Sequence, residues 1–492
     1  MFNTRRRAKV NIRFVIVLVT AVIAAGFSLF AAREAHRAVI SKRSLEEGQA
    51  AYEQKDWAKA AEDFRKYMRY NPNDLDILKK YAEALMSIRP MDAASVSSAI
   101  RAYRRIVQMD SLDQNAYEKL AQLYGAVENF EELAYIARTR LKQLPSDSKA
   151  HLWLAQAQAG MLRFAEARKT LDNLIEALNE LPQKPDEYVQ ACSLMSKIVS
   201  DPTISGTMDD ALDWLTDAVE ACPQSVEALA TRAQFYRQES DISGLSEEDR
   251  LAKARGDLDA ADALGTGNPR IRLFLGSEWL ELGEPERANA ELKAIEGLPQ
   301  QALDKYFIDP AQLTIGKFLL SSKLAMKKKD AVECAALAEK VLMEFKVRNY
   351  RSRVLPAAVM LYIAAGETTK AKQYLDEYLD PTYAQEKSEK ARLESLYLQA
   401  LVARVQERPY DVINILQPAV TMDASRAELW QLMAEAYIQT DQPRRAVKAL
   451  IKYLNVRPRD KDITLQLANE YLKLQDWTKA FETARLAESL DE

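Results

Sequence analysis

The residue types that most often carry chemistry in proteins are sparse in this sequence and lie far apart. The two histidines, His36 and His151, have no cysteine or second histidine at metal-ligand spacing. A zinc site or a Cys–His nucleophile would need such a partner, and the sequence contains neither a Walker-type loop nor a G-x-S-x-G turn. The sequence therefore predicts no catalytic residue, no metal site and no cofactor, and a protein that is not an enzyme.

Two further motifs have structural explanations. Gly265-Thr266-Gly267 is followed by Asn268-Pro269, which is typical of a helix end and a turn rather than of a dinucleotide-binding loop. The three cysteines are widely spaced and odd in number, so they do not form a disulfide framework. We expect small buried apolar side chains there, with a Cys192–Cys222 bridge as the alternative.

Composition and charge limit the fold class and the partners. Only 14 of 492 residues are glycine, 48% are apolar, and strong helix formers fill most of the rest, so the class is all-α. Five basic residues and no acidic one lie in residues 1–13, which leaves 63 basic and 72 acidic residues in the remainder. A mildly acidic body argues against nucleic acid as the ligand, because phosphate binding needs a basic face.

Residues 14–32, FVIVLVTAVIAAGFSLFAA, form an apolar run without a charge. As a helix this run would be about 28 Å long, close to the hydrocarbon thickness of a bilayer. A cleaved signal peptide is the alternative, but its apolar region is normally about 7–15 residues long and ends in a small-residue site. Here Leu29 or Phe30 would stand three residues before the cut. We therefore predict an uncleaved transmembrane helix over residues 14–32, preceded by a basic tail over residues 1–13.

The flanking charges favour a cytoplasmic N-terminus by a small margin. Five lysines and arginines precede the span, and four follow it closely, namely Arg33, Arg37, Lys42 and Arg43. We predict a single-pass protein of a bacterial inner membrane, with its large body outside the cytoplasm. No glycine or proline lies between Gly26 and Gly48, so a juxtamembrane helix over residues 33–44 is expected to continue the span as a stiff stalk.

The body of the sequence repeats. Residues 48–74 and 428–460 both contain an alanine with a large apolar residue at offset +4, a tyrosine at +7 and a proline at +12. These residues are Ala60, Phe64, Tyr67 and Pro72 in the first segment, and Ala446, Leu450, Tyr453 and Pro458 in the second. Small residues are expected where two helices approach closely, apolar residues form a stripe, and proline ends the second helix.

This pattern resembles the tetratricopeptide repeat family, in which each repeat is a helix pair of about 34 residues. The resemblance implies a right-handed α-α superhelical solenoid of about 11–12 helix pairs, preceded here by the transmembrane helix. A ladder of residues marks the second helix of each pair: Ala60, Ala99, Leu133, Ala167, Ala211, Ala254, Ala288, Ala331, Ala371, Ile413, Ala446 and Ala480.

Two segments interrupt the repeats. Residues 238–250 form an acidic insertion, and residues 299–310 break the helical rhythm; both are expected to be solvated loops. A change of curvature at the second segment would divide the body into an N-terminal array over residues 45–299 and a C-terminal array over residues 300–492.

The resemblance also implies a binding groove, formed by the fifth, ninth and twelfth positions of the first helix of each repeat. One subfamily clamps the carboxylate of chaperone tails with Lys, Asn and Arg at such positions. Leu45 and Gln49 stand there in the first repeat, which argues against that activity. The candidate groove residues are Lys79, Glu83, Met86, Gln431, Glu435, Ile438, Leu465, Asn469 and Leu472.

We therefore predict a membrane-anchored scaffold that binds protein or peptide partners of unknown identity in a multiprotein envelope assembly. One alternative is a membrane receptor whose repeats face the cytosol and recruit soluble clients. A more remote alternative is an accessory subunit of an envelope polysaccharide or secretion enzyme system. The last helix has no polar capping helix after it, so self-association through this C-terminal end is also expected.

Overall fold

The computed structural model describes residues 12–89, 93–201, 203–204, 206–239, 242–299, 310–381 and 389–490, and for residues 12–32 it describes only the backbone. These residues form 24 helices and no strand. They fall into two compact units, Met1–Glu247 and Glu248–Glu492. The predicted all-α helical-repeat fold is confirmed, in agreement with the scarcity of glycine and the abundance of helix formers.

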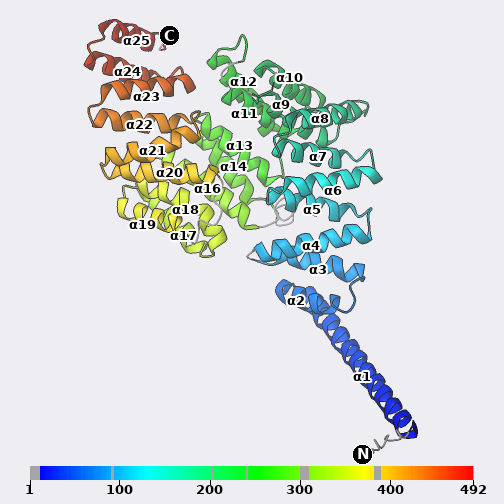
Figure 1. Cartoon of the computed structure of the whole chain (residues 1–492). Helices are drawn as coiled ribbons and strands as arrows, with labels where there is room; N and C mark the ends of the chain where they lie inside the picture. Colours follow the sequence, from blue (N-terminus) through cyan, green and yellow to red (C-terminus); the bar gives the residue numbers. More distant parts are fainter. Residues whose placement is uncertain are drawn as a thin grey trace, which may run out of the picture. The chain divides into compact units, whose positions relative to one another are not determined.

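The helices of the first unit follow one another in short antiparallel steps (Figure 1). They are α1 (Ile12–Glu53), α2 (Trp57–Met68), α3 (Leu75–Ser87), α4 (Ala93–Met109), α5 (Gln114–Ala126), α6 (Phe130–Gln143), α7 (Ser148–Gly160), α8 (Phe164–Asn179), α9 (Asp186–Val199), α10 (Met208–Ala221) and α11 (Val226–Gln238).

The second unit continues the same arrangement of consecutive helices. They are α12 (Glu247–Leu264), α13 (Pro269–Glu281), α14 (Pro285–Glu296), α16 (Pro310–Lys328), α17 (Ala331–Glu344), α18 (Arg348–Ala364), α19 (Thr368–Leu379), α20 (Glu389–Val405), α21 (Pro409–Met422), α22 (Ala427–Gln439), α23 (Pro443–Val456), α24 (Lys461–Lys473) and α25 (Trp477–Ser489). We call the first helix of a pair helix A and the second helix B, so that α22 and α24 are A helices and α23 and α25 are B helices.

The turn inside a pair is built on one residue with a left-handed backbone. Its φ is +54° at Glu128, +59° at Leu162 and +59° at Gln475. The next residue donates its N–H to the carbonyl five positions back, as Asn129 does to Tyr124 at 2.9 Å. This is the Schellman ending of a helix, and it lets helix B begin soon after helix A ends. Glycine, which adopts this conformation most easily, occupies the position at Gly283 and Gly366.

Leu162→Gly is expected to raise the free energy of unfolding by about 0.5–1 kcal/mol. Leu162 is 75% exposed, so little packing is lost, and glycine removes about 1–2 kcal/mol of left-handed strain against a smaller entropic cost. Urea unfolding followed by circular dichroism measures the change. The reverse substitution, Gly283→Ala, should lower stability; a loss of stability in Leu162→Gly would contradict this explanation of the turn.

The turn between pairs is built on an aspartate that makes two kinds of bond. Asp74 and Asp460 cap α3 and α24, and each accepts the N–H of the third helical residue at 3.0–3.1 Å. The second carboxylate oxygen accepts the phenol of a tyrosine seven positions earlier, at 2.7 Å from Tyr67 and 2.6 Å from Tyr453. Helix B is thereby bonded to the start of the next helix A.

These tyrosines should make the protein sensitive to alkali. Burial and the hydrogen bond to Asp74 raise the pKa of Tyr67 to about 12, and burial and Asp460 do the same for Tyr453. An unfolded tyrosine ionises near pH 10. Because the folded pKa is raised, the contribution to stability is fully present below pH 10 and is lost as pH rises from 10 to 12.

The urea midpoint is therefore expected to fall between pH 10 and pH 12. A Tyr67→Phe/Tyr453→Phe double variant should show a shallower fall over the same interval. Tyr410→Phe, at an exposed position, is the matched control. Its urea midpoint should fall with pH as steeply as that of the unsubstituted chain. An equal slope in all three proteins would show that these two tyrosines do not link pH to folding.

The ladder predicted from the repeats marks the contact between the two helices of a pair. Eleven of its twelve residues are buried, and in α2, α6, α8, α23 and α25 the ladder residue is the fourth of helix B. The prediction was wrong at Ala331, which is exposed because it is the first residue of α17 and precedes the first packed turn. Cys334, the fourth residue of α17, is fully buried in its place.

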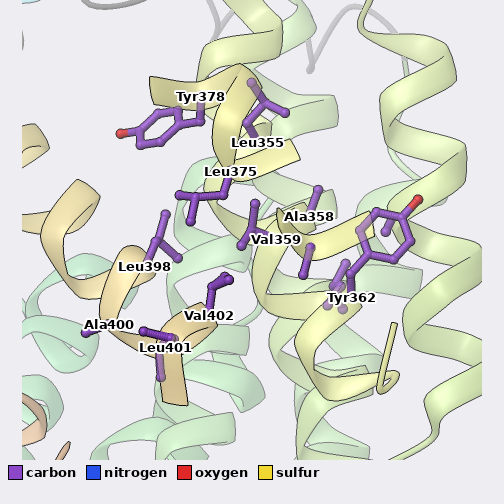
Figure 2. Packing of buried hydrophobic residues seen from close by; sticks show 14 of the residues in the cluster. Leu355, Ala358, Val359, Tyr362, Leu375, Tyr378, Leu398, Ala400, Leu401 and Val402 are labelled. Carbon is purple, nitrogen blue, oxygen red and sulfur yellow. The ribbon is translucent and has the colours of Figure 1, made fainter. Parts of the chain in front are cut away.

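The core runs along the array rather than gathering at one centre. Figure 2 shows this in the second unit, where Leu355 and Val359 of α18 lie beside Leu375 of α19 and Leu398 of α20. Each helix pair thus buries its apolar stripe against its neighbours, and stability is expected to depend on contacts between adjacent pairs.

Three predicted features need separate mention. Among the residues described in full, no helix is long and apolar enough to cross a membrane. The side chains of the basic tail over residues 1–13 and of the predicted span over residues 14–32 lie outside that description; in the backbone, α1 runs uninterrupted from Ile12 to Glu53. Residues 300–309, where we expect the arrays to divide, and residues 240–241 of the acidic insertion also lie outside it.

Candidate functional site

The candidate groove residues of the first unit already have partners within the chain. Lys79 of α3 forms an ion pair with Asp113 at 2.6 Å, and this hydrogen-bonded contact raises the pKa of Lys79. Glu83 accepts the phenol of Tyr52 at 2.5 Å. Met86 is half-buried against the core of this unit. These side chains serve contacts between neighbouring helices, so fewer of their polar atoms are available to a partner.

Such contacts recur where consecutive A helices meet. They join residues 31 positions apart, close to the repeat length, and so link equivalent faces of neighbouring pairs. Examples are Tyr52 with Glu83 at 2.5 Å, Glu118 with Lys149 at 2.6 Å, and Arg404 with Glu435 at 3.4 Å.

The surface between α22 and α24 contains an open pocket. Its volume is about 670 Å³, and it lies between two consecutive A helices. Three of the candidate groove residues line it, namely Glu435 and Ile438 on α22 and Asn469 on α24. Gln439, Gln466, Glu470 and Lys473 complete the lining.

The remaining candidates lie outside the lining of this pocket. Gln431 of α22 is half-buried, and Leu465 and Leu472 of α24 are exposed. That any of the nine residues binds a peptide stays a prediction. Sequence reasoning missed Glu470, because it considered only the fifth, ninth and twelfth positions of helix A, and Glu470 occupies the tenth.

The pocket offers several hydrogen-bond acceptors close together. Two carboxylates and three carboxamides line it, with one ammonium group, on Lys473. Carboxamides can donate to and accept from the backbone of an extended peptide. The arrangement suits recognition of a polar chain and contains no nucleophile paired with a base.

The groups associated with metal or thiol chemistry are not gathered anywhere in the described residues. No group of three or more His, Cys, Asp or Glu side chains there could hold a metal ion. All three cysteines are free thiols, so no Cys192–Cys222 bridge is formed. Burial raises the pKa of the Cys192 thiol to about 12, so this thiol is protonated at neutral pH and is a weak nucleophile.

The last helix pair exposes large apolar side chains. Trp477, Phe481 and Leu486 of α25 are between 51% and 70% exposed. One repeat earlier, Val447 and Leu450 of α23 are buried against Ile463 and Leu467 of α24. Self-association through α25 stays a prediction.

Comparison with known proteins supports the same repeat class. The chain is 22% identical over 413 residues to a protein named tetratricopeptide repeat protein 21 homolog from Caenorhabditis briggsae. The chain is similar to a tetratricopeptide repeat protein. This similarity covers 72% of the chain but only 29% of that relative, so the relative's full role does not transfer. No family model matches the sequence.

Solved structures give weaker matches. Yeast Tom70 aligns over 92% of this chain and 89% of its own, at 12% identity and a TM-score of 0.39. A tetratricopeptide repeat protein from Parabacteroides merdae aligns over 56% of this chain and 99% of its own, at 15% identity and a TM-score of 0.37. Both TM-scores are below 0.5.

Proposed function

We propose that this chain is a scaffold that binds protein or peptide partners on the A-helix side of its repeats, as part of a multiprotein assembly. The observation that carries the proposal is the polar pocket between α22 and α24, which is lined by Glu435, Ile438 and Asn469 of two consecutive A helices. The similarity to a tetratricopeptide repeat protein and the repeated helix pairs support it.

Photo-crosslinking in the cells of origin tests this proposal. A photoreactive amino acid in place of Ile438 or Asn469 is expected to trap discrete protein adducts, because both side chains line the pocket. The same amino acid in place of Arg485, exposed on α25, is the control and should trap none of them. Identical adducts from all three positions, or none from the pocket, would contradict a partner site here.

We further propose that residues 14–32 anchor the chain in a bacterial inner membrane, with the repeats outside the cytoplasm. The proposal is supported by the uncharged run over these residues and the basic residues before it. If it holds, the continuous helix α1 would serve as the stalk. Resistance of the full chain to extraction at alkaline pH is expected, whereas a chain with two arginines inside residues 14–32 should be extracted.

Protease shaving of spheroplasts tests the orientation separately. The proposed topology predicts that protease digests the body together with a periplasmic control protein. Protection of the body while the control is digested would reverse the topology and favour a receptor whose repeats face the cytosol.

A further inference from the structure

One position in α24 holds a glutamate where most of the comparable helix pairs have a buried apolar residue. In several helix pairs the residue ten positions before the ladder residue lies on helix A and is buried. In five of these pairs the buried residue is apolar, namely Leu123, Ala157, Leu361, Ala403 and Ala436. Ten positions before Ala480 stands Glu470, which is 3% exposed. A carboxylate therefore occupies a place where the fold accepts alanine or leucine.

The pair formed by α13 and α14 also has a glutamate at this position, Glu278. Unlike Glu470, Glu278 has no buried oxygen without a partner, and it takes part in a polar interaction. Glu470 is only half satisfied. Its Oε1 accepts a hydrogen bond from Lys473 Nζ at 2.6 Å, whereas its Oε2 is buried and has no hydrogen-bond partner among the described residues. A buried carboxylate oxygen without a hydrogen bond destabilises the folded chain. A hydrogen-bond donor from a bound partner would remove this destabilisation.

Glu470 is also a lining residue of the pocket between α22 and α24. On the opposite wall, Glu435 is bonded to Arg404 of α20, at 3.4 Å. The walls present two carboxylates, the carboxamides of Gln439, Gln466 and Asn469, and one ammonium group, that of Lys473, which is already bonded to Glu470. A guanidinium or ammonium group brings several N–H donors and a positive charge, which matches this set of acceptors, whereas an acidic side chain would meet two carboxylates.

We propose that this pocket receives a basic side chain, arginine or lysine, of an extended segment of the partner, and that the Glu470 carboxylate is its acceptor, after a turn of the side chain that brings Oε2 to the pocket. This inference rests on the proposed function and adds the chemical class of the partner. The acidic balance of residues 14–492, with 63 basic and 72 acidic residues, favours the approach of a basic segment.

The test starts from random dodecapeptides displayed on phage and selected on the full chain in detergent micelles. Arginine or lysine is expected at one fixed position of the selected peptides. A synthetic peptide of the strongest sequence should bind at least tenfold more weakly to Glu470→Gln. Replacing its fixed basic residue by citrulline, or by norleucine where it is lysine, should weaken binding to a similar extent. Combining both changes should cost little more than either alone, because the two groups meet.

Glu470→Ala distinguishes a binding role of Glu470 from a purely structural one. Alanine is the residue of the preceding pair, at Ala436, so this variant should unfold at the same temperature or a higher one while losing peptide binding. Glu482→Gln, an exposed residue of α25, removes the same charge and should keep the affinity of the unsubstituted chain.

The outcomes separate the two proposals. If peptides are selected but have no fixed basic residue, or if Glu470→Gln binds them equally well, the basic-residue pocket is refuted and peptide binding stands. If no peptide is selected at all, both are refuted. If Glu470→Gln instead abolishes self-association measured by sedimentation, the occupant is a second copy of this chain and the partner segment is refuted.

Discussion

Trp279→Ala is expected to lower the free energy of unfolding of the unit Glu248–Glu492 by about 3–5 kcal/mol, the usual cost of removing a buried tryptophan. The side chain of Trp279 on α13 is completely buried. Its indole N–H donates to Asp262 Oδ2 at 3.1 Å, and the guanidinium carbon of Arg287 lies 3.8 Å from the ring centre. The substitution therefore removes packing, a hydrogen bond and a cation–π contact together.

Urea unfolding followed by far-ultraviolet circular dichroism measures this loss. Trp279→Phe keeps an aromatic ring but removes the N–H that Asp262 accepts. It should lower the free energy of unfolding by about 1–3 kcal/mol. Trp477→Ala is the matched control, because Trp477 is 66% exposed and its loss should change stability by less than about 0.5 kcal/mol. Equal effects of Trp279→Ala and Trp477→Ala would show that α13 is not packed as described.

Arg140→Met should destabilise the unit Met1–Glu247 by about 3–5 kcal/mol, the cost of removing one partner of a buried ion pair. Arg140 of α6 takes the place that Tyr67 and Tyr453 have in their repeats. Its Nε donates to Asp147 Oδ2 at 2.8 Å, and its Nη1 donates to the carbonyl of Leu112 at 3.2 Å. Methionine retains the apolar volume of the side chain but leaves both acceptors without this donor.

The matching control is Arg138→Met on the exposed side of the same helix, which should stay within about 0.5 kcal/mol of the unsubstituted chain. Asp147→Ala also removes the cap of α7, where Asp147 accepts the N–H of Ala150 at 3.1 Å. The double variant should cost less than the sum of the single ones, because each single change breaks the same pair. Simple additivity would contradict a direct coupling between Arg140 and Asp147.

The contact made by Arg140 and the equivalent contacts of Tyr67 and Tyr453 are visible to different degrees in the sequence. The tyrosine at a fixed offset from the ladder residue indicated a regular feature at Tyr67 and Tyr453. The partner of each tyrosine is the aspartate seven positions later, which caps the next helix. This partner is apparent only in the folded structure. At Arg140 the same place is filled by a different residue type, which a pattern of apolar and aromatic residues does not detect.

The candidate site, too, was only partly predictable from the sequence. The repeat register placed Glu435, Ile438 and Asn469 on the A-helix side, and these residues line one pocket. The register could not show that Lys79 and Glu83 are bonded to neighbouring helices, because those partners lie about one repeat away in sequence. Comparing the tenth position of helix A across repeats would have pointed to Glu278 and Glu470, but the burial of Glu470 and its unpartnered oxygen depend on the packing of side chains.

By itself the sequence determined the helical class, the pairing of helices and most of the buried ladder, because all three follow from local periodicity and from the small residues that close packing requires. It also predicts an anchor over residues 14–32. Only the tertiary structure decided that Cys334 replaces Ala331 in the ladder, that Leu162 adopts a left-handed backbone, and that an open pocket lies beside Glu470. These features depend on where a helix begins and on which side chains from different repeats meet, and such distances are set by packing rather than by local sequence.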